Sequence, residues 1–62
     1  MRYPNAADVE RVAEALQARP ATVGQISREC GMPAVKVESA LKALRWQGRA
    51  VGLRDSRWRA RA

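Results

Sequence analysis

The chain has 62 residues, of which 12 are Lys or Arg and six are Asp or Glu, so its net charge at pH 7 is +6. This length predicts a single small domain over residues 1–62, near the lower limit at which a hydrophobic core suffices without added cross-links. One cysteine and no histidine exclude a disulfide within one chain and the usual zinc ligand sets.

A first helix is predicted over residues 6–18. Asn5 is a suitable N-cap, and apolar side chains then recur at the spacing of one helical face, at Val9, Val12, Ala13 and Leu16. Two glutamates make the outer surface of this helix acidic, so we assign the helix to the scaffold. Pro20 ends it, because the residue before a proline avoids the helical region. Residues 21–23 are predicted to be a short extended segment that can pair with a later hairpin.

A second helix is predicted over residues 23–30. Thr22 and Gln25 have the spacing of a capping box, in which each side chain satisfies a backbone N–H near the other residue. Gly31 can adopt the left-handed conformation that closes a helix. Cys30 is interpreted as a small buried apolar residue, because no histidine is present to activate a catalytic thiol.

The third helix is predicted over residues 33–47 and begins at Pro33, whose missing N–H is no loss in the first turn. One apolar stripe faces the core, with Val37, Ala40, Leu41 and Leu44. The opposite surface carries small, polar and basic groups, with Glu38 and Arg45 flanking Val35, Ser39, Lys42 and Trp46. Two helices joined by a short glycine-containing turn form a helix-turn-helix, whose second helix can enter a DNA major groove. An ordinary helical pair of a small core is the alternative.

An antiparallel hairpin is predicted over residues 49–61, where the apolar pattern changes to period 2 around the polar turn Asp55-Ser56. If Arg54 pairs with Arg57, one face of the hairpin is apolar, with Val51, Leu53, Trp58 and Ala60. The other face then gathers four arginines, Arg54, Arg57, Arg59 and Arg61. A slip of one residue would pair these side chains differently.

Almost all of the excess positive charge lies at the C-terminal end of the chain. Residues 45–62 hold six arginines and one aspartate, whereas the preceding residues are nearly balanced. Like charges on one face of a sheet repel one another, so this arrangement favours a polyanionic partner that neutralises them. The alternative is a solvated basic tail, but a tail has little use for Trp58.

The predicted order is helix, short extended segment, helix, tight turn, helix and β-hairpin, which makes the fold class α+β and mainly α. From about Asn5 to Arg61 it resembles the winged helix-turn-helix DNA-binding family. The resemblance is carried by Thr22-Val-Gly-Gln-Ile-Ser, Gly31-Met-Pro, Val37-x3-Leu41-x2-Leu44, Gly48-Arg-Ala and Arg57-Trp-Arg.

The resemblance implies a recognition helix in the major groove and a two-stranded wing that touches phosphates or the minor groove. We expect the nucleic-acid contacts from Val35, Ser39, Lys42, Arg45, Trp46, Arg54, Arg57, Arg59 and Arg61. The chain is also similar to winged helices that bind left-handed nucleic acid and have a comparable wing tryptophan. That subfamily expects Asn and Tyr where this chain has Glu38 and Lys42, so its specificity is not carried over.

Two side chains of the third helix have alternative roles. Glu38 can accept a hydrogen bond from cytosine N4 or pair with Lys42 one turn later, and we favour the ion pair. Trp46 can stack on a base, receive an arginine in a cation–π contact, or mark a surface for another protein. Trp58 is interpreted as packing the wing onto the helices.

These patterns predict a small transcriptional regulator that binds duplex DNA. The alternative is a winged-helix protein-interaction module, acting as a homodimer or in a larger complex, and RNA binding stays open. We expect no catalytic activity and no cofactor, because the sequence has no histidine and no phosphate-cradling glycine motif. No stretch approaches the roughly 20 apolar residues of a membrane span, so we expect no membrane partner and a cytoplasmic location.

Overall fold

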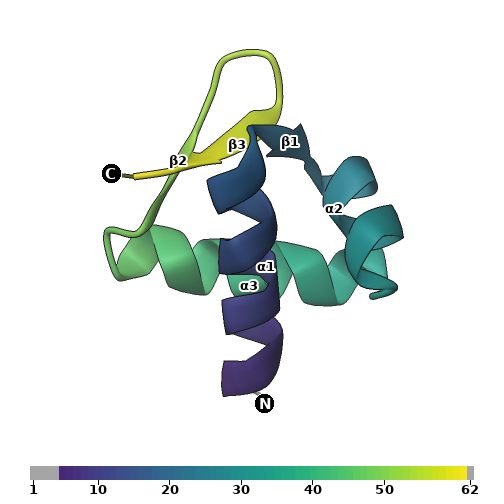
Figure 1. Cartoon of the computed structure of the whole chain (residues 1–62). Coiled ribbons are helices and arrows are strands. Elements are labelled where there is room, and N and C mark those ends of the chain that lie inside the picture. The colour runs from purple at the N-terminus through teal and green to yellow at the C-terminus, as the bar shows by residue number, and fades with distance from the viewer. Residues whose placement is uncertain (1–4, 62) are drawn as a thin grey trace.

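The computed structural model describes residues 5–61, which form three helices and a three-stranded antiparallel sheet (Figure 1). The elements in chain order are α1 (Ala6–Ala18), β1 (Ala21–Thr22), α2 (Val23–Cys30), α3 (Ala34–Trp46), β2 (Ala50–Gly52) and β3 (Arg57–Ala60). The predicted fold class, α+β and mainly α, is therefore confirmed, with a winged-helix-like topology. The first two helices occupy the predicted ranges, and α3 is one residue shorter at each end.

Local capping explains where the first two helices begin and end. Asn5 accepts a hydrogen bond from the N–H of Ala7 at 2.8 Å. The hydroxyl of Thr22 accepts from the N–H of Gln25 at 3.1 Å, and the Gln25 amide oxygen accepts from the N–H of Thr22 at 2.9 Å. Gly31 closes α2 in the left-handed region with a φ of 65°. These contacts are the capping box and glycine stop that the sequence predicts.

Pro33 caps α3 instead of forming its first residue. Its ψ of 145° is extended, and its carbonyl oxygen accepts from the N–H groups of Lys36 and Val37. Proline suits this place because it fixes φ and has no N–H to satisfy. The turn between α2 and α3 is correspondingly short.

The sheet has the strand order β1-β3-β2, so the predicted hairpin gains a third strand from the segment before α2. Ala21 pairs with Trp58, and Thr22 pairs with Arg57. The expectation that residues 21–23 include an extended segment paired with the hairpin is thus confirmed for β1. Because Thr22 also caps α2, one residue joins the sheet to the helix-turn-helix.

The predicted hairpin register is wrong by one residue. Gly52, and not Leu53, pairs with Trp58. The reason is a three-residue loop, in which Leu53 donates to the Arg57 carbonyl at 2.7 Å and Ser56 has a φ of 71°. A hairpin loop of this length ends in a left-handed residue. A serine at position 56 does not indicate such a residue in the sequence.

The corrected register changes which side chains share a face of the hairpin. Ala50, Trp58 and Ala60 lie on the face that packs against the helices. Val51 and Leu53 are half-buried and lie with Arg57 and Arg59 on the other face. The predicted apolar face is therefore wrong, and so is the predicted face of four arginines, because Arg54 belongs to the turn.

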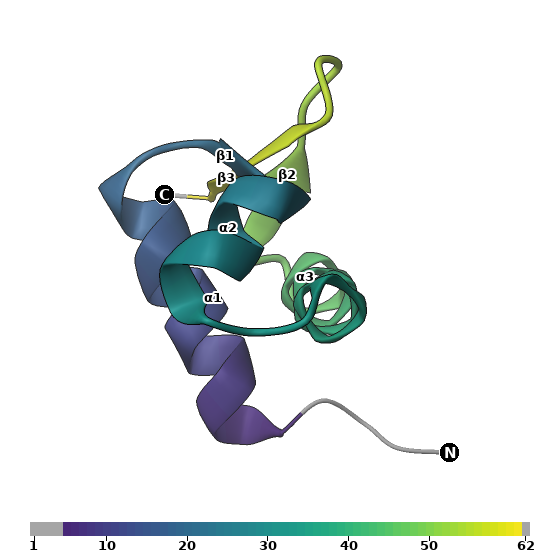
Figure 2. The same ribbon diagram turned by 90° about the vertical axis from the view of Figure 1, so that its right-hand side faces the viewer.

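The core lies between the three helices and the inner face of the sheet. Figure 2 looks along α3 and shows α1 and α2 on one side of it, with the hairpin above. The buried side chains include the predicted stripes of α1 and α3, namely Val9, Val12, Ala13, Leu16, Val37, Ala40, Leu41 and Leu44. Ala21, Ile26, Met32 and Ala50 complete the buried set. Cys30 is half-buried at the margin of this core, so it is less enclosed than predicted.

A bidentate ion pair joins the start of the hairpin to α1. Nη1 of Arg49 lies 2.8 Å from Oε2 of Glu10, and Nη2 lies 2.9 Å from Oε1. The hydrogen bonds from Arg49 lower the pKa of Glu10 below its ordinary value of 4.5. The same bonds raise the pKa of Arg49.

This ion pair predicts a pH dependence of stability. Because the pKa of Glu10 is lower in the folded than in the unfolded chain, the stabilisation is complete above pH 4.5 and is lost as the pH falls through the folded value. We expect the thermal unfolding midpoint, followed by circular dichroism, to fall between about pH 5 and about pH 3. Glu10→Gln should show a smaller fall over the same interval. Parallel curves for the two proteins would contradict a contribution from this pair.

Candidate functional site

The surface of α3 opposite the core is open to solvent. Val35, Ser39, Lys42, Arg45 and Trp46 are all exposed, as the helical pattern predicts. The two apolar members are unusually open, with exposed fractions of 69% for Val35 and 92% for Trp46. Within residues 5–61, no other element lies against this side of α3 (Figure 2).

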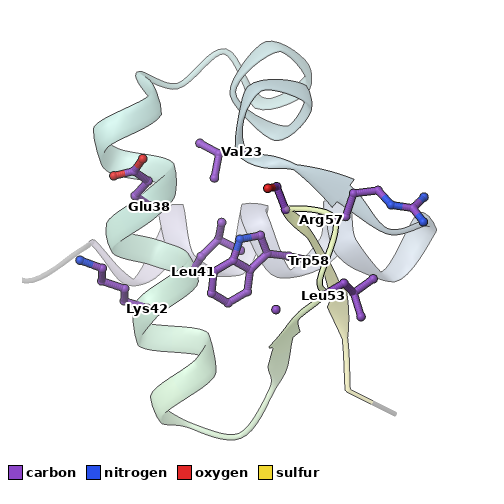
Figure 3. A pocket seen from close by; sticks show the side chains of 9 residues that line it. Val23, Glu38, Leu41, Lys42, Leu53, Arg57 and Trp58 are labelled. Atoms are coloured by element: carbon purple, nitrogen blue, oxygen red, sulfur yellow. The ribbon is translucent and has the colours of Figure 1, made fainter.

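A cleft of about 410 Å³ separates α3 from the hairpin (Figure 3). It is lined by Val23, Glu38, Leu41, Lys42, Gly52, Leu53, Ser56, Arg57 and Trp58. Glu38 and Lys42 stand on its α3 side, one turn apart. One flank of α3 and the hairpin therefore border the same hollow.

Trp58 forms the floor of this cleft on the hairpin side. Its indole leans toward Leu41 of α3 (Figure 3). The ring also covers Gly52 on the neighbouring strand, where an added Cβ would lie 3.8 Å from Cη2 of the indole. An aromatic side chain across from a strand glycine covers the surface that the glycine leaves bare. Trp58 thus packs the hairpin onto the helical core, as its sequence position suggests.

The arginines of the hairpin point in different directions. Arg54 lies in the turn, and Arg57 and Arg59 lie on the outer face of β3. Figure 3 shows the Arg57 side chain leaving the strand on the side away from Trp58. Its Nε donates to Oδ2 of Asp55 at 2.9 Å. Arg57 is therefore partly neutralised within the hairpin, whereas Arg54 carries its charge at the tip.

The environment of Asp55 shows how this turn is held. Partial burial raises the pKa of Asp55, but hydrogen bonds from the backbone N–H and the guanidinium of Arg57 outweigh it and lower the pKa overall. The N–H of Arg57 lies 3.3 Å from Oδ1 of Asp55. Asp55 thus fixes the loop geometry in addition to pairing with a cation.

The other predicted arginines lie outside the cleft. Arg45 and Arg61 border a shallow hollow beside β2, together with Val51 and Leu53. Arg59 borders a different hollow, at the end of α1 with Arg19. The structure therefore places Lys42 on the α3 side of the cleft and Arg45 in a hollow with Arg61, whereas Arg59 borders a hollow that α3 does not line.

The predicted ion pair between Glu38 and Lys42 is not formed. The ion pairs among residues 5–61 are Arg19–Glu29, Arg49–Glu10 and Arg57–Asp55. An exposed pair at this helical spacing gains only about 0.2–0.5 kcal/mol, which is too little to hold two long side chains together. Among the described residues, neither Glu38 nor Lys42 has an ion-pair partner.

Sequence reasoning missed the residues that complete the cleft from outside α3. Val23, Gly52 and Leu53 line it, although none of them was predicted to belong to the site. Leu53 was assigned to the inner face because of the register error. Glycine or asparagine at position 56 would have indicated a left-handed residue there and hence the three-residue loop. Serine gives no such indication.

A scan against protein-family models found no match to this chain, and comparisons with curated proteins and with solved structures found none either. Within the described part of the chain, no group of three or more Cys, Asp and Glu side chains could hold a metal ion. None of the helices in that part has the length and apolar character to cross a membrane. The interpretation of the site therefore rests on its geometry and charge.

Proposed function

We propose that this protein binds duplex DNA as a small transcriptional regulator, with α3 in the major groove and the hairpin against the sugar–phosphate backbone. The observation that carries the proposal is the cleft between α3 and the hairpin. In such an arrangement, the exposed side of the helix can enter a groove while the projecting hairpin contacts the sugar–phosphate backbone beside it.

The size of α3 suits this role. Its 13 residues make a rod about 20 Å long at 1.5 Å per residue. The major groove is about 12 Å wide and admits a single helix. Ser39 and Lys42 lie in the middle of the exposed side, where they would face base edges.

The charge distribution supports a polyanionic ligand. Lys42 borders the cleft, Arg45 borders the hollow beside β2, and Arg54 lies in the hairpin turn. Each of these three side chains is exposed and makes no ion pair within residues 5–61. A cationic side chain that neutralises a phosphate releases counterions condensed on the DNA, which contributes affinity without regard to base sequence.

Fluorescence anisotropy of a labelled duplex at several salt concentrations tests the proposal. We expect the logarithm of the association constant to fall with the logarithm of salt concentration with a slope of about −4, which corresponds to four or five phosphates at −0.9 each. Unlabelled RNA duplex should compete poorly. Absence of binding at low salt would contradict the proposal, and equal competition by RNA would contradict the preference for DNA.

A protein-interaction module is the second candidate, and the exposure of Trp46 and Val35 favours it. These side chains lie near opposite ends of the same side of α3. Two copies of α3 packed antiparallel about a two-fold axis would place each Trp46 on the partner's Val35. Sedimentation of the same samples distinguishes DNA binding from a protein-interaction role, because a dimer that binds no duplex would favour the protein-interaction module.

A further inference from the structure

Glu38 is the one carboxylate on α3, and no contact with another residue of the described part of the chain explains its position. Of the six acidic side chains, Glu10, Glu29 and Asp55 make ion pairs. Asp8 and Glu14 lie on α1. Glu38 is exposed, makes no ion pair with any residue from 5 to 61, and stands on the rim of the cleft (Figure 3).

A carboxylate at this place works against general affinity for a polyanion. It repels phosphates, and it also reduces the positive field of Lys42 and Arg45 beside it. A carboxylate only accepts hydrogen bonds, so it needs a donor on the ligand. In the major groove, the exposed amino group of cytosine is a donor with no acceptor on the same base edge.

We propose that Glu38 selects a C·G base pair, with its carboxylate accepting a hydrogen bond from N4 of the cytosine. Lys42, on the same side of the helix one turn later, donates to O6 or N7 of the paired guanine. Adenine fits less well, because its N7 acceptor lies beside its amino donor and would face the carboxylate. This inference rests on the proposed binding of duplex DNA by α3.

The test is selection from a pool of random-sequence DNA duplexes by the wild-type protein and by Glu38→Gln. A glutamine offers an acceptor and a donor together and therefore suits adenine. We expect the wild-type pool to fix one position as C·G and the variant pool to move that position toward A·T. Changing this base pair in the selected duplex should lower the affinity of the wild-type protein by on the order of tenfold.

The same variant has a second expected effect of opposite sign. Removing the negative charge should make Glu38→Gln bind the unselected pool a few-fold more tightly at low salt. Glu14→Gln on α1 is the matched control, since it makes the same change away from α3 and should alter neither property. A structural role for Glu38 would not tighten binding to unselected duplex while it changes the preferred base.

Three results would overturn the inference, and they separate it from the parent proposal. Selection of the same base pair by wild-type protein and Glu38→Gln would show that another residue reads it. Duplex binding by wild type without any fixed C·G position would leave DNA binding standing and remove the role of Glu38. Absence of duplex binding by wild type at low salt would remove both proposals.

Discussion

Replacing Arg54 and Arg57 together by alanine is expected to weaken binding to every duplex by on the order of tenfold at low salt, and to reduce the salt slope by about 2. Arg54 lies exposed in the hairpin turn and forms no ion pair among the residues that the structure describes. Loss of Arg57 also leaves Asp55 without its partner, so a bare carboxylate would then face the phosphates. Both changes act on the backbone contact and leave base preference unaltered.

Arg11→Ala with Arg19→Ala is the matched control for this experiment. It removes the same charge from α1 and from the residue after it, away from the exposed side of α3. We expect the control to keep most of the salt slope, measured by the same anisotropy titration, with circular dichroism showing that both double variants fold. Equal losses in the two double variants would mean that net charge alone, and not the hairpin, holds the duplex.

The helices of this fold are predictable from sequence because their signals are local. Thr22, Gln25 and Gly31 act within a few residues of one another, and each makes the contact that its spacing indicates. The buried stripe of α3 follows directly from the 3.6-residue period. The same period predicts its exposed side, including Trp46.

The hairpin could be predicted as an element but not in its register. The choice between a two-residue and a three-residue loop depends on the φ of Ser56, and serine takes a positive φ only when the surrounding contacts hold it there. Asp55 supplies such contacts through Arg57. One loop residue thus decides that Leu53 lies on the outer face of the hairpin and that Gly52 lies under Trp58.

The cleft and its charges depend on contacts between residues far apart in sequence. The ion pair of Glu10 with Arg49 joins α1 to the hairpin, and no local sequence pattern predicts this ion pair. Arg59 borders a hollow with residues from the end of α1, which is also a contact between segments far apart in sequence. Of the predicted site residues, Lys42 and Arg57 line the cleft, and the grouping of its other lining residues could be found only from the tertiary structure.

Leu41→Ala is expected to lower the free energy of unfolding by about 2–5 kcal/mol. Leu41 has an exposed fraction of 1%, and it lies below the cleft where Trp58 leans onto α3 (Figure 3). Truncation would leave a cavity under the hairpin as well as removing apolar contacts. A chain of this length has only about 3–9 kcal/mol of total stability at 0.05–0.15 kcal/mol per residue, so the variant should be marginally folded.

Urea unfolding followed by circular dichroism measures this loss, and Trp46→Ala on the same helix is its control. Trp46 is the larger side chain, but 92% of it is exposed, so its removal should change the free energy of unfolding by only about 0.5 kcal/mol or less. A comparable loss in both variants would mean that Trp46 is covered in solution, as in the α3-paired dimer. A large loss in Leu41→Ala alone would assign the stability of α3 to its buried side and leave Trp46 free for a ligand.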